Sequence, residues 1–122
     1  MSKYTILVAD DSRSMIQVIE SILEEAGYHV LTAENGKEAL DIIKENNIDL
    51  VVTDFNMPGI NGMGVLRKVR EETSTKSIPV VMLTTEAEMN KVVEAKNAGI
   101  SGWIIKPFEP SKLLSTVKEL LP

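Results

Sequence analysis

Five short apolar runs alternate along this chain with longer segments whose apolar residues recur every three or four positions. The runs predict strands at Thr5–Ala9, His29–Ala33, Leu50–Thr53, Pro79–Leu83 and Trp103–Ile105. The first, third and fourth runs are almost continuously apolar, which is typical of parallel strands that are covered on both faces. The alternation therefore predicts an α/β fold, a doubly wound five-stranded parallel sheet built from five βα units.

The segments between and after these strands predict five helices. Their apolar stripes span Met15–Ala26, Ala39–Ile43, Leu66–Val69, Val92–Ala98 and Leu113–Leu121. Gly27 and Gly99 are placed where the first and fourth helices need a left-handed residue to end. The 122 residues hold neither a long repeat nor a linker, so we expect a single domain over residues 1–122 with no output domain.

Composition excludes several kinds of site. Cysteine is absent and His29 is the one histidine, so thiol chemistry and multi-histidine metal sites are excluded, and a bound metal must be held by oxygen. The net charge of −5 disfavours binding to nucleic acid or to an anionic membrane. No run is long enough for a signal peptide or a membrane span, and we expect a cytoplasmic protein.

Polar residues follow four of the predicted strands, at the sheet edge where doubly wound folds bind ligands. The residues that follow these strands are Asp10, Asp11 and Ser12; Asp54, Phe55 and Asn56; Thr84 and Thr85; and Lys106 and Pro107, and all but Phe55 and Pro107 are polar. Each group alone has an ordinary structural interpretation, as a helix cap, a turn or a solvated charge. Their combination at one edge favours a functional site.

Charge balance indicates the chemistry of that site. Two carboxylates about 4 Å apart repel by on the order of 4 kcal/mol at an effective dielectric near 20, so Asp10, Asp11 and Asp54 need a cation. An all-oxygen site favours Mg²⁺, and Lys106 adds a further positive charge. The pocket is then nearly neutral and ready for an anion. One aspartate can attack phosphorus to form an aspartyl phosphate.

Other phosphate sites do not match. Neither a Walker loop nor a dinucleotide-binding glycine motif follows the first strand. We interpret Gly59, Gly62 and Gly64, which precede the predicted third helix, as residues that shape the loop at the site.

Four runs in this chain resemble the receiver domain of two-component response regulators, specifically the single-domain chemotaxis type. They are ADDS at 9–12, DFNMPGINGMGVL at 54–66, VVMLTTEA at 80–87 and AGISGWIIKPF at 98–108, and they occur in the family's order and spacing. The resemblance covers essentially the whole chain. It implies a flavodoxin-like (βα)5 fold with strand order 2-1-3-4-5.

The resemblance also assigns roles. Asp54 matches the phosphoryl acceptor, and Lys106 the lysine that contacts the phosphoryl group. Mg²⁺ would be held by Asp10, Asp11, Asp54 and the backbone carbonyl of Asn56. The peptide bond from Lys106 to Pro107 is expected to be cis.

In receivers, a threonine and an aromatic residue on the fifth strand form the switch, here Thr84 and Trp103. Phosphorylation draws the hydroxyl and Lys106 inward, and the aromatic ring moves into the vacated space. Trp103 replaces the family's usual Tyr or Phe, and its bulk opposes a full inward rotation.

The implied function is a signalling switch that takes a phosphoryl group from a histidine kinase. It catalyses its own phosphorylation and dephosphorylation without being an enzyme on external substrates. The implied partners are the kinase, a flagellar motor switch protein or other effector bound at the face of the fourth helix, fifth strand and fifth helix, and a phosphatase. A monomer is expected.

Three alternatives are set beside this function. A phosphorelay intermediate, which passes phosphate to another histidine protein, is not distinguished by the sequence. A Mg²⁺-dependent phosphohydrolase would place a general acid two residues after the nucleophile, where this chain has Asn56, which cannot donate a proton in that role. A flavodoxin-like cofactor binder would need a phosphate loop after the first strand.

Overall fold

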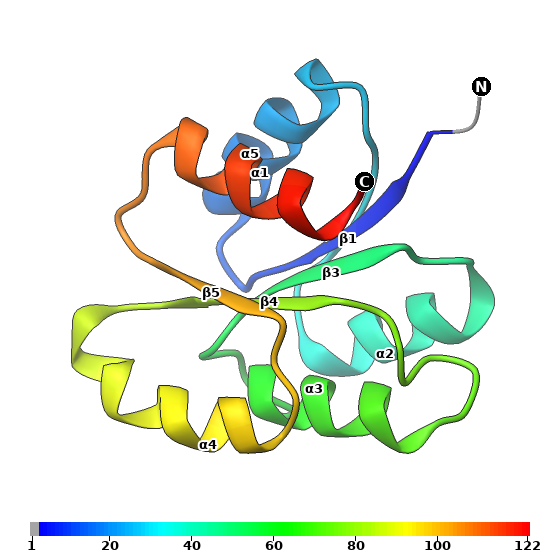
Figure 1. Ribbon diagram of the computed structural model, residues 1–122, viewed down its shortest axis with the longest axis vertical. Helices are drawn as coiled ribbons and strands as arrows, with labels where there is room; N and C mark the ends of the chain where they lie inside the picture. The colour runs from blue at the N-terminus through cyan, green and yellow to red at the C-terminus, as the bar shows by residue number, and fades with distance from the viewer. Residues whose placement is uncertain (1–2) are drawn as a thin grey trace.

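Five βα units make up the chain in the computed structural model, which describes residues 3–122 (Figure 1). The strands are β1 Thr5–Ala9, β2 His29–Ala33, β3 Leu50–Asp54, β4 Val80–Thr84 and β5 Gly102–Ile105. The helices are α1 Arg13–Glu25, α2 Gly36–Glu45, α3 Gly62–Glu71, α4 Val92–Asn97 and α5 Pro110–Leu120, with a 3₁₀ segment η1 at Glu86–Lys91.

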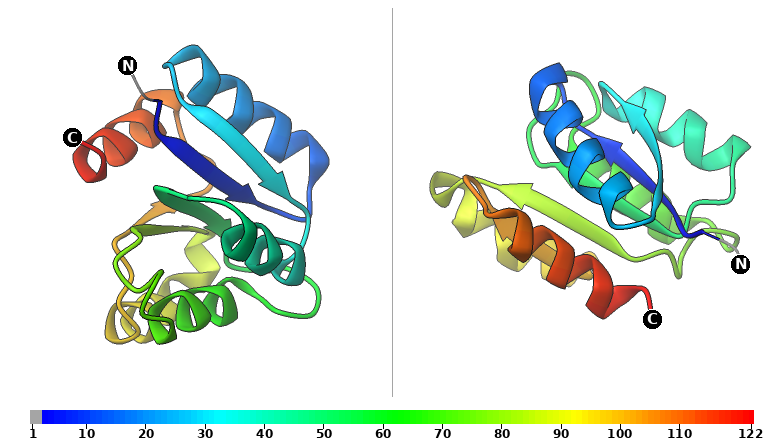
Figure 2. Two further views of the ribbon diagram at one scale, coloured as in Figure 1. Left: turned by 90° about the vertical axis from the view of Figure 1, so that its right-hand side faces the viewer. Right: turned by 90° about the horizontal axis from the view of Figure 1, so that it is seen from above.

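The strands form one parallel sheet in the order β2-β1-β3-β4-β5. This confirms both the predicted fold class and the strand order implied by the resemblance. Helices α1 and α5 cover one face of the sheet, and α2, α3 and α4 cover the other (Figures 1 and 2). In the described part of the chain, no helix has the length and apolar character needed to cross a membrane.

Two apolar cores lie on opposite faces of the sheet, and alternate strand residues enter each. In β1, Ile6 and Val8 pack in the core under α1 and α5, whereas Leu7 and Ala9 pack in the core under α2 and α3. All four are fully buried. Because side chains alternate across a strand, a strand covered on both faces places apolar residues at nearly every position, as the first, third and fourth predicted runs do.

Local signals position the helices around this sheet. The side chains of Ser12, Asn35 and Asn61 cap α1, α2 and α3 by accepting hydrogen bonds from backbone N–H groups in the first turn. Gly27 and Gly99 have φ angles of +97° and +94°, which confirms the predicted left-handed helix ends.

Several boundaries differ from the predicted ones by one residue. The strands β3 and β4 include Asp54 and Thr84, because these polar residues continue the pairing of their strands. Pro79 precedes β4, and β5 begins one residue earlier, at Gly102. The fourth helix begins at Val92, where its predicted apolar stripe begins, and the 3₁₀ segment η1 precedes it.

The glycines near the start of α3 differ from the prediction that all three shape the loop. Gly62 and Gly64 lie in the first turn of α3, so only Gly59, with a φ of +73°, belongs to the loop. Gly62 still shapes the edge of the sheet, because a Cβ at this position would lie 2.5 Å from the Asp54 carbonyl oxygen and 2.6 Å from Met82 Sδ.

We therefore expect Gly62→Ala to lower the free energy of unfolding by about 1–3 kcal/mol, as overpacking of a dense interior does. Unfolding in urea, monitored by circular dichroism, measures this free energy. Gly102→Ala is the matched control, because its added Cβ would meet only Thr116 Cγ2 at 3.6 Å, an ordinary contact. Equal stability of the two variants would contradict the close approach at Gly62.

Candidate functional site

Three carboxylates meet at the carboxyl edge of the sheet, as the sequence predicts. Asp10 directly follows β1, Asp11 comes next, and Asp54 ends β3, the neighbouring strand. One oxygen from each lies within 4.8 Å of the others. Asp10 is buried and Asp54 nearly so, with 1% and 8% of their surfaces exposed, whereas Asp11 is exposed. Solvent therefore reaches the cluster mainly at Asp11.

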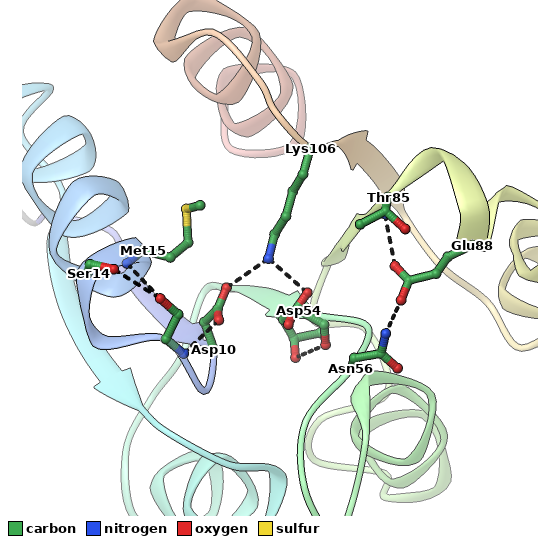
Figure 3. Close-up of polar contacts among 10 residues, drawn as sticks. Asp10, Ser14, Met15, Asp54, Asn56, Thr85, Glu88 and Lys106 are labelled. Carbon is green, nitrogen blue, oxygen red and sulfur yellow. Dashed lines mark hydrogen bonds and ion pairs between the residues drawn. The ribbon is translucent and has the colours of Figure 1, made fainter.

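Lys106, at the end of β5, reaches across β4 to this cluster (Figure 3). Its Nζ donates to Asp54 Oδ1 at 3.0 Å and to Asp10 Oδ2 at 3.2 Å. Its backbone N–H donates to the Thr84 carbonyl oxygen at 2.7 Å, and its peptide bond to Pro107 is cis, as the resemblance implies. Backbone pairing thus fixes the position of the Lys106 backbone, and the ammonium group of its side chain joins the two carboxylates.

The remaining hydrogen bonds leave part of the cluster free. Asp10 Oδ1 accepts from the backbone N–H of Ser12 at 2.9 Å, so both oxygens of Asp10 have partners. Ser12 Oγ in turn caps α1. Within residues 3–122, Asp54 Oδ2 accepts no hydrogen bond. The helix-cap interpretation of this segment therefore holds for Ser12, whereas the aspartates face the site.

Electrostatics leave the site short of positive charge. Burial raises the pKa of the Asp54 carboxyl, the charges of Asp10 and Asp11 raise it further, and Lys106 only partly offsets the rise. Burial lowers the pKa of Lys106, but its hydrogen bonds and charge interactions with Asp54 and Asp10 outweigh this effect and raise it. Three carboxylates thus share one ammonium.

The residues present fit a hard divalent cation. The cluster offers carboxylate oxygens from three side chains, and carboxylates are the ligands that Mg²⁺ prefers in proteins. A cation would also supply the positive charge that the cluster lacks. The predicted ligands Asp10, Asp11 and Asp54 are brought together, and Asn56 lies on the loop that follows Asp54.

Thr84 and Trp103 line one small cavity of about 10 Å³ behind the site, together with Phe55, Met82 and residues of α4. Thr84 is buried, and its hydroxyl donates within the described residues only to Met89 Sδ, 4.0 Å away. A thioether is a weak acceptor. Trp103 is half-buried, and Lys96 Nζ lies 4.8 Å from the centre of its ring.

Glu88 in η1 is a residue of the site that the sequence reasoning missed. Its Oε1 accepts from the Thr85 backbone N–H at 2.8 Å, and its Oε2 accepts from the side-chain amide of Asn56 (Figure 3). The Asn56 side chain therefore points to η1. The order Thr85-Glu86-Ala87-Glu88 has the Thr-x-x-Glu spacing of a capping box, which is a signal for Glu88 that the sequence contains.

A broad open groove lies on the outer side of β5. It has a volume of about 880 Å³ and is lined by β5, the loop that follows it and α5, including Trp103, Ile105, Phe108 and Lys112. Ile105 is 38% exposed on this surface. Trp103 thus contacts both the internal cavity beside Thr84 and the outer groove.

Comparisons with known proteins agree with this geometry. Residues 6–118 match the response regulator receiver domain. The chain is 36% identical to chemotaxis protein CheY of Pseudomonas aeruginosa over 116 residues, or 94% of each chain. It is 39% identical to CheY1 of Helicobacter pylori over 118 residues, or 95% of each.

Solved structures give the same result. The structure of Vibrio cholerae chemotaxis protein CheY4 superposes with a TM-score of 0.93 at 38% identity, and the match covers 98% of this chain and 100% of that one. The sequence identity, the strand order and the edge cluster all lead to one family. The chain is a member of the response regulator receiver domain family.

Proposed function

We propose that Asp54 is the phosphoryl acceptor of a chemotaxis signalling switch. The observation that carries this proposal is the position of its carboxylate. One oxygen is held by Lys106, the other accepts no hydrogen bond within residues 3–122, and Asp10 and Asp11 lie beside it. Relatives named chemotaxis protein CheY support the assignment to chemotaxis signalling.

In the proposed reaction, the free Asp54 oxygen attacks the phosphorus of a phosphohistidine on a kinase. The O–P bond forms as the N–P bond breaks, and the imidazole leaves with the electron pair of that bond. Lys106 holds the nucleophile in place and stabilises the charge on the phosphoryl oxygens. In the reverse half of the cycle, water attacks the phosphorus, the bond from the phosphorus to the Asp54 oxygen breaks, and inorganic phosphate leaves. The chain thus catalyses its own phosphorylation and dephosphorylation.

Asp10, Asp11, Asp54 and the backbone carbonyl of Asn56 would hold Mg²⁺ in this proposal. When bound, the ion offsets the repulsion between the carboxylates and the incoming phosphoryl group. The three carboxylates and one ammonium of the cluster support this assignment, because they need further positive charge.

The proposed switch links Asp54 to β5. A phosphoryl group offers strong acceptor oxygens, which attract the Thr84 hydroxyl away from its weak thioether partner. Trp103 lines the same cavity and responds to the space that Thr84 leaves. Lys106 and Pro107 follow Trp103 at the end of β5, so a movement of the lysine reaches the same strand.

The output surface in this proposal is the face of α4, β5 and α5. Its groove is lined by Trp103, and it carries the exposed apolar side chains of Ile105 and Val93, which is 65% exposed. The proposed occupant is a flagellar motor switch protein or another effector. A histidine kinase and a phosphatase complete the partners of a cytoplasmic, monomeric receiver.

We expect Asp54→Asn to abolish phosphorylation while the fold is retained. The amide oxygen is a far weaker nucleophile than a carboxylate, so the O–P bond does not form. Intact mass after incubation with acetyl phosphate and Mg²⁺ measures this, with Asp41→Asn on the exposed side of α2 as the matched control. Acid-labile phosphate retained on Asp54→Asn would contradict the acceptor role.

Lys106→Ala is expected to slow phosphorylation on the order of 100-fold, because a preorganised charge facing the phosphoryl group is lost. When the variant and the wild type are compared at the same phosphorylated fraction, phosphorylation should not change partner binding by the variant. Intact mass and partner binding, measured on the same samples, test both effects. Lys118→Ala, an exposed lysine in the last turn of α5, is the control. Normal partner binding by phosphorylated Lys106→Ala would exclude the lysine from the switch.

Trp103 fluorescence should change when the protein is phosphorylated, because the residue lines the cavity beside Thr84. It is the one tryptophan of the chain, so the signal has a single source. The change should require both Mg²⁺ and Asp54 and should decay together with the phosphorylated mass. A constant signal at full phosphorylation would show that Trp103 takes no part in the switch.

A further inference from the structure

One carboxylate connects the two loops on either side of the proposed acceptor. Glu88 belongs to η1, which follows β4, whereas Asn56 belongs to the loop that follows β3. The Glu88 side chain is half-buried and accepts from Asn56 Nδ2 with one oxygen and from the Thr85 backbone N–H with the other. Figure 3 shows this bridge beside Asp54, on the side away from Asp10.

The two donors that Glu88 holds lie close in sequence to the residues that the switch uses. Asn56 is two residues after Asp54, and Thr85 directly follows Thr84. Both are hydrogen-bond donors near the position where new phosphoryl oxygens would need donors. In the structure, both are already paired with a competing anion.

Movement of Thr84 also acts on this bridge. The N–H of Thr85 is joined to Thr84 by one peptide bond, so an inward shift of Thr84 displaces the N–H that Glu88 binds. The tie at the other end, to Asn56, resists that displacement because it anchors the same carboxylate to the opposite loop. The bridge therefore stabilises the resting arrangement of both loops.

We propose that Glu88 is a positioning residue that opposes phosphorylation of Asp54 by tying Asn56 to the loop after Thr84. The proposal rests on the function proposed above. It assigns to this chain an intrinsic brake on its own activation, built from one side chain that does not touch the acceptor.

A purely structural role is the alternative, since Glu88 also caps the start of η1 through the Thr85 N–H. Glu88→Gln separates the two roles. Its amide oxygen can still accept from Thr85, whereas the loss of the second carboxylate oxygen and of the charge reduces the charge-assisted tie to Asn56 to a neutral amide–amide hydrogen bond at most. Asn56→Ala removes the same tie from the other side and leaves the cap intact.

The test is the rate constant of phosphorylation by acetyl phosphate with Mg²⁺, followed by intact mass. We expect Glu88→Gln and Asn56→Ala each to raise it about three- to tenfold, as loss of one charge-assisted hydrogen bond does. The double variant should be no faster than the faster single variant, because both changes break the same tie. Hydrogen exchange of the η1 amides should match that of the wild type in Glu88→Gln, because the bond from the Thr85 N–H is retained.

Glu86→Gln is the matched control, because it removes the same charge from the same 3₁₀ segment and Glu86 makes no hydrogen bond or ion pair within residues 3–122. If Glu86→Gln raised the phosphorylation rate as much as Glu88→Gln does, the effect would come from the lost negative charge alone, and the proposal would be overturned. A Glu88→Gln rate within twofold of wild type, or fully multiplicative effects in the double variant, would also overturn it.

The experiment distinguishes failure of the proposed function from failure of the role proposed for Glu88. A wild-type protein that takes no phosphate on Asp54 would overturn the proposed function and the brake with it. A wild-type protein that is phosphorylated on Asp54, beside a Glu88→Gln variant of unchanged rate, would overturn the brake alone.

Discussion

Mutual repulsion of three carboxylates at one sheet edge is the constraint on which the rest of this structure depends. Asp10 and Asp54 are largely withdrawn from water, so their charges are poorly screened, and a single ammonium lies between them. The chain tolerates this arrangement because the apolar cores on both sides of the sheet stabilise the fold independently of the edge. The edge can therefore keep an unfavourable charge balance, which is the condition for attracting a cation and an anion in turn.

Lys106 connects the charge of this cluster to the position of β5. Its ammonium group binds the carboxylates of Asp10, directly after β1, and Asp54, at the end of β3, whereas its backbone pairs with Thr84 and continues β5. A change of charge at the edge is thus felt at the strand that borders the outer groove. Thr84 adds a second connection, because its weakly held hydroxyl shares a cavity with Trp103. Two short connections, one through charge and one through packing, join the site to the proposed output face.

The sequence predicted most of this arrangement, and its failures have physical causes. The strands Thr5–Ala9 and His29–Ala33 were placed correctly because apolar runs coincide with pairing there. Asp54 and Thr84 were placed outside their strands because pairing continues one residue beyond the apolar run. Periodicity carries no information on the lateral order of strands, so that order came only from the family resemblance. Glu88 was missed because its partner Asn56 is 32 residues away, and spacing reveals only local contacts.

A few hydrogen bonds of modest strength stabilise the unphosphorylated arrangement of the site. The bond from Glu88 to Asn56 is an exposed charge-assisted hydrogen bond, worth on the order of 1 kcal/mol after solvent screening. The bond from Lys106 to Asp10 is part-buried and is worth about 2 kcal/mol. A phosphoryl group brings one to three new bonds of the same kind. The two sets are comparable, and moving a population from about 1:99 to 99:1 needs about 5.5 kcal/mol. Phosphorylation is therefore expected to shift an existing equilibrium, and each resting tie determines how complete that shift becomes.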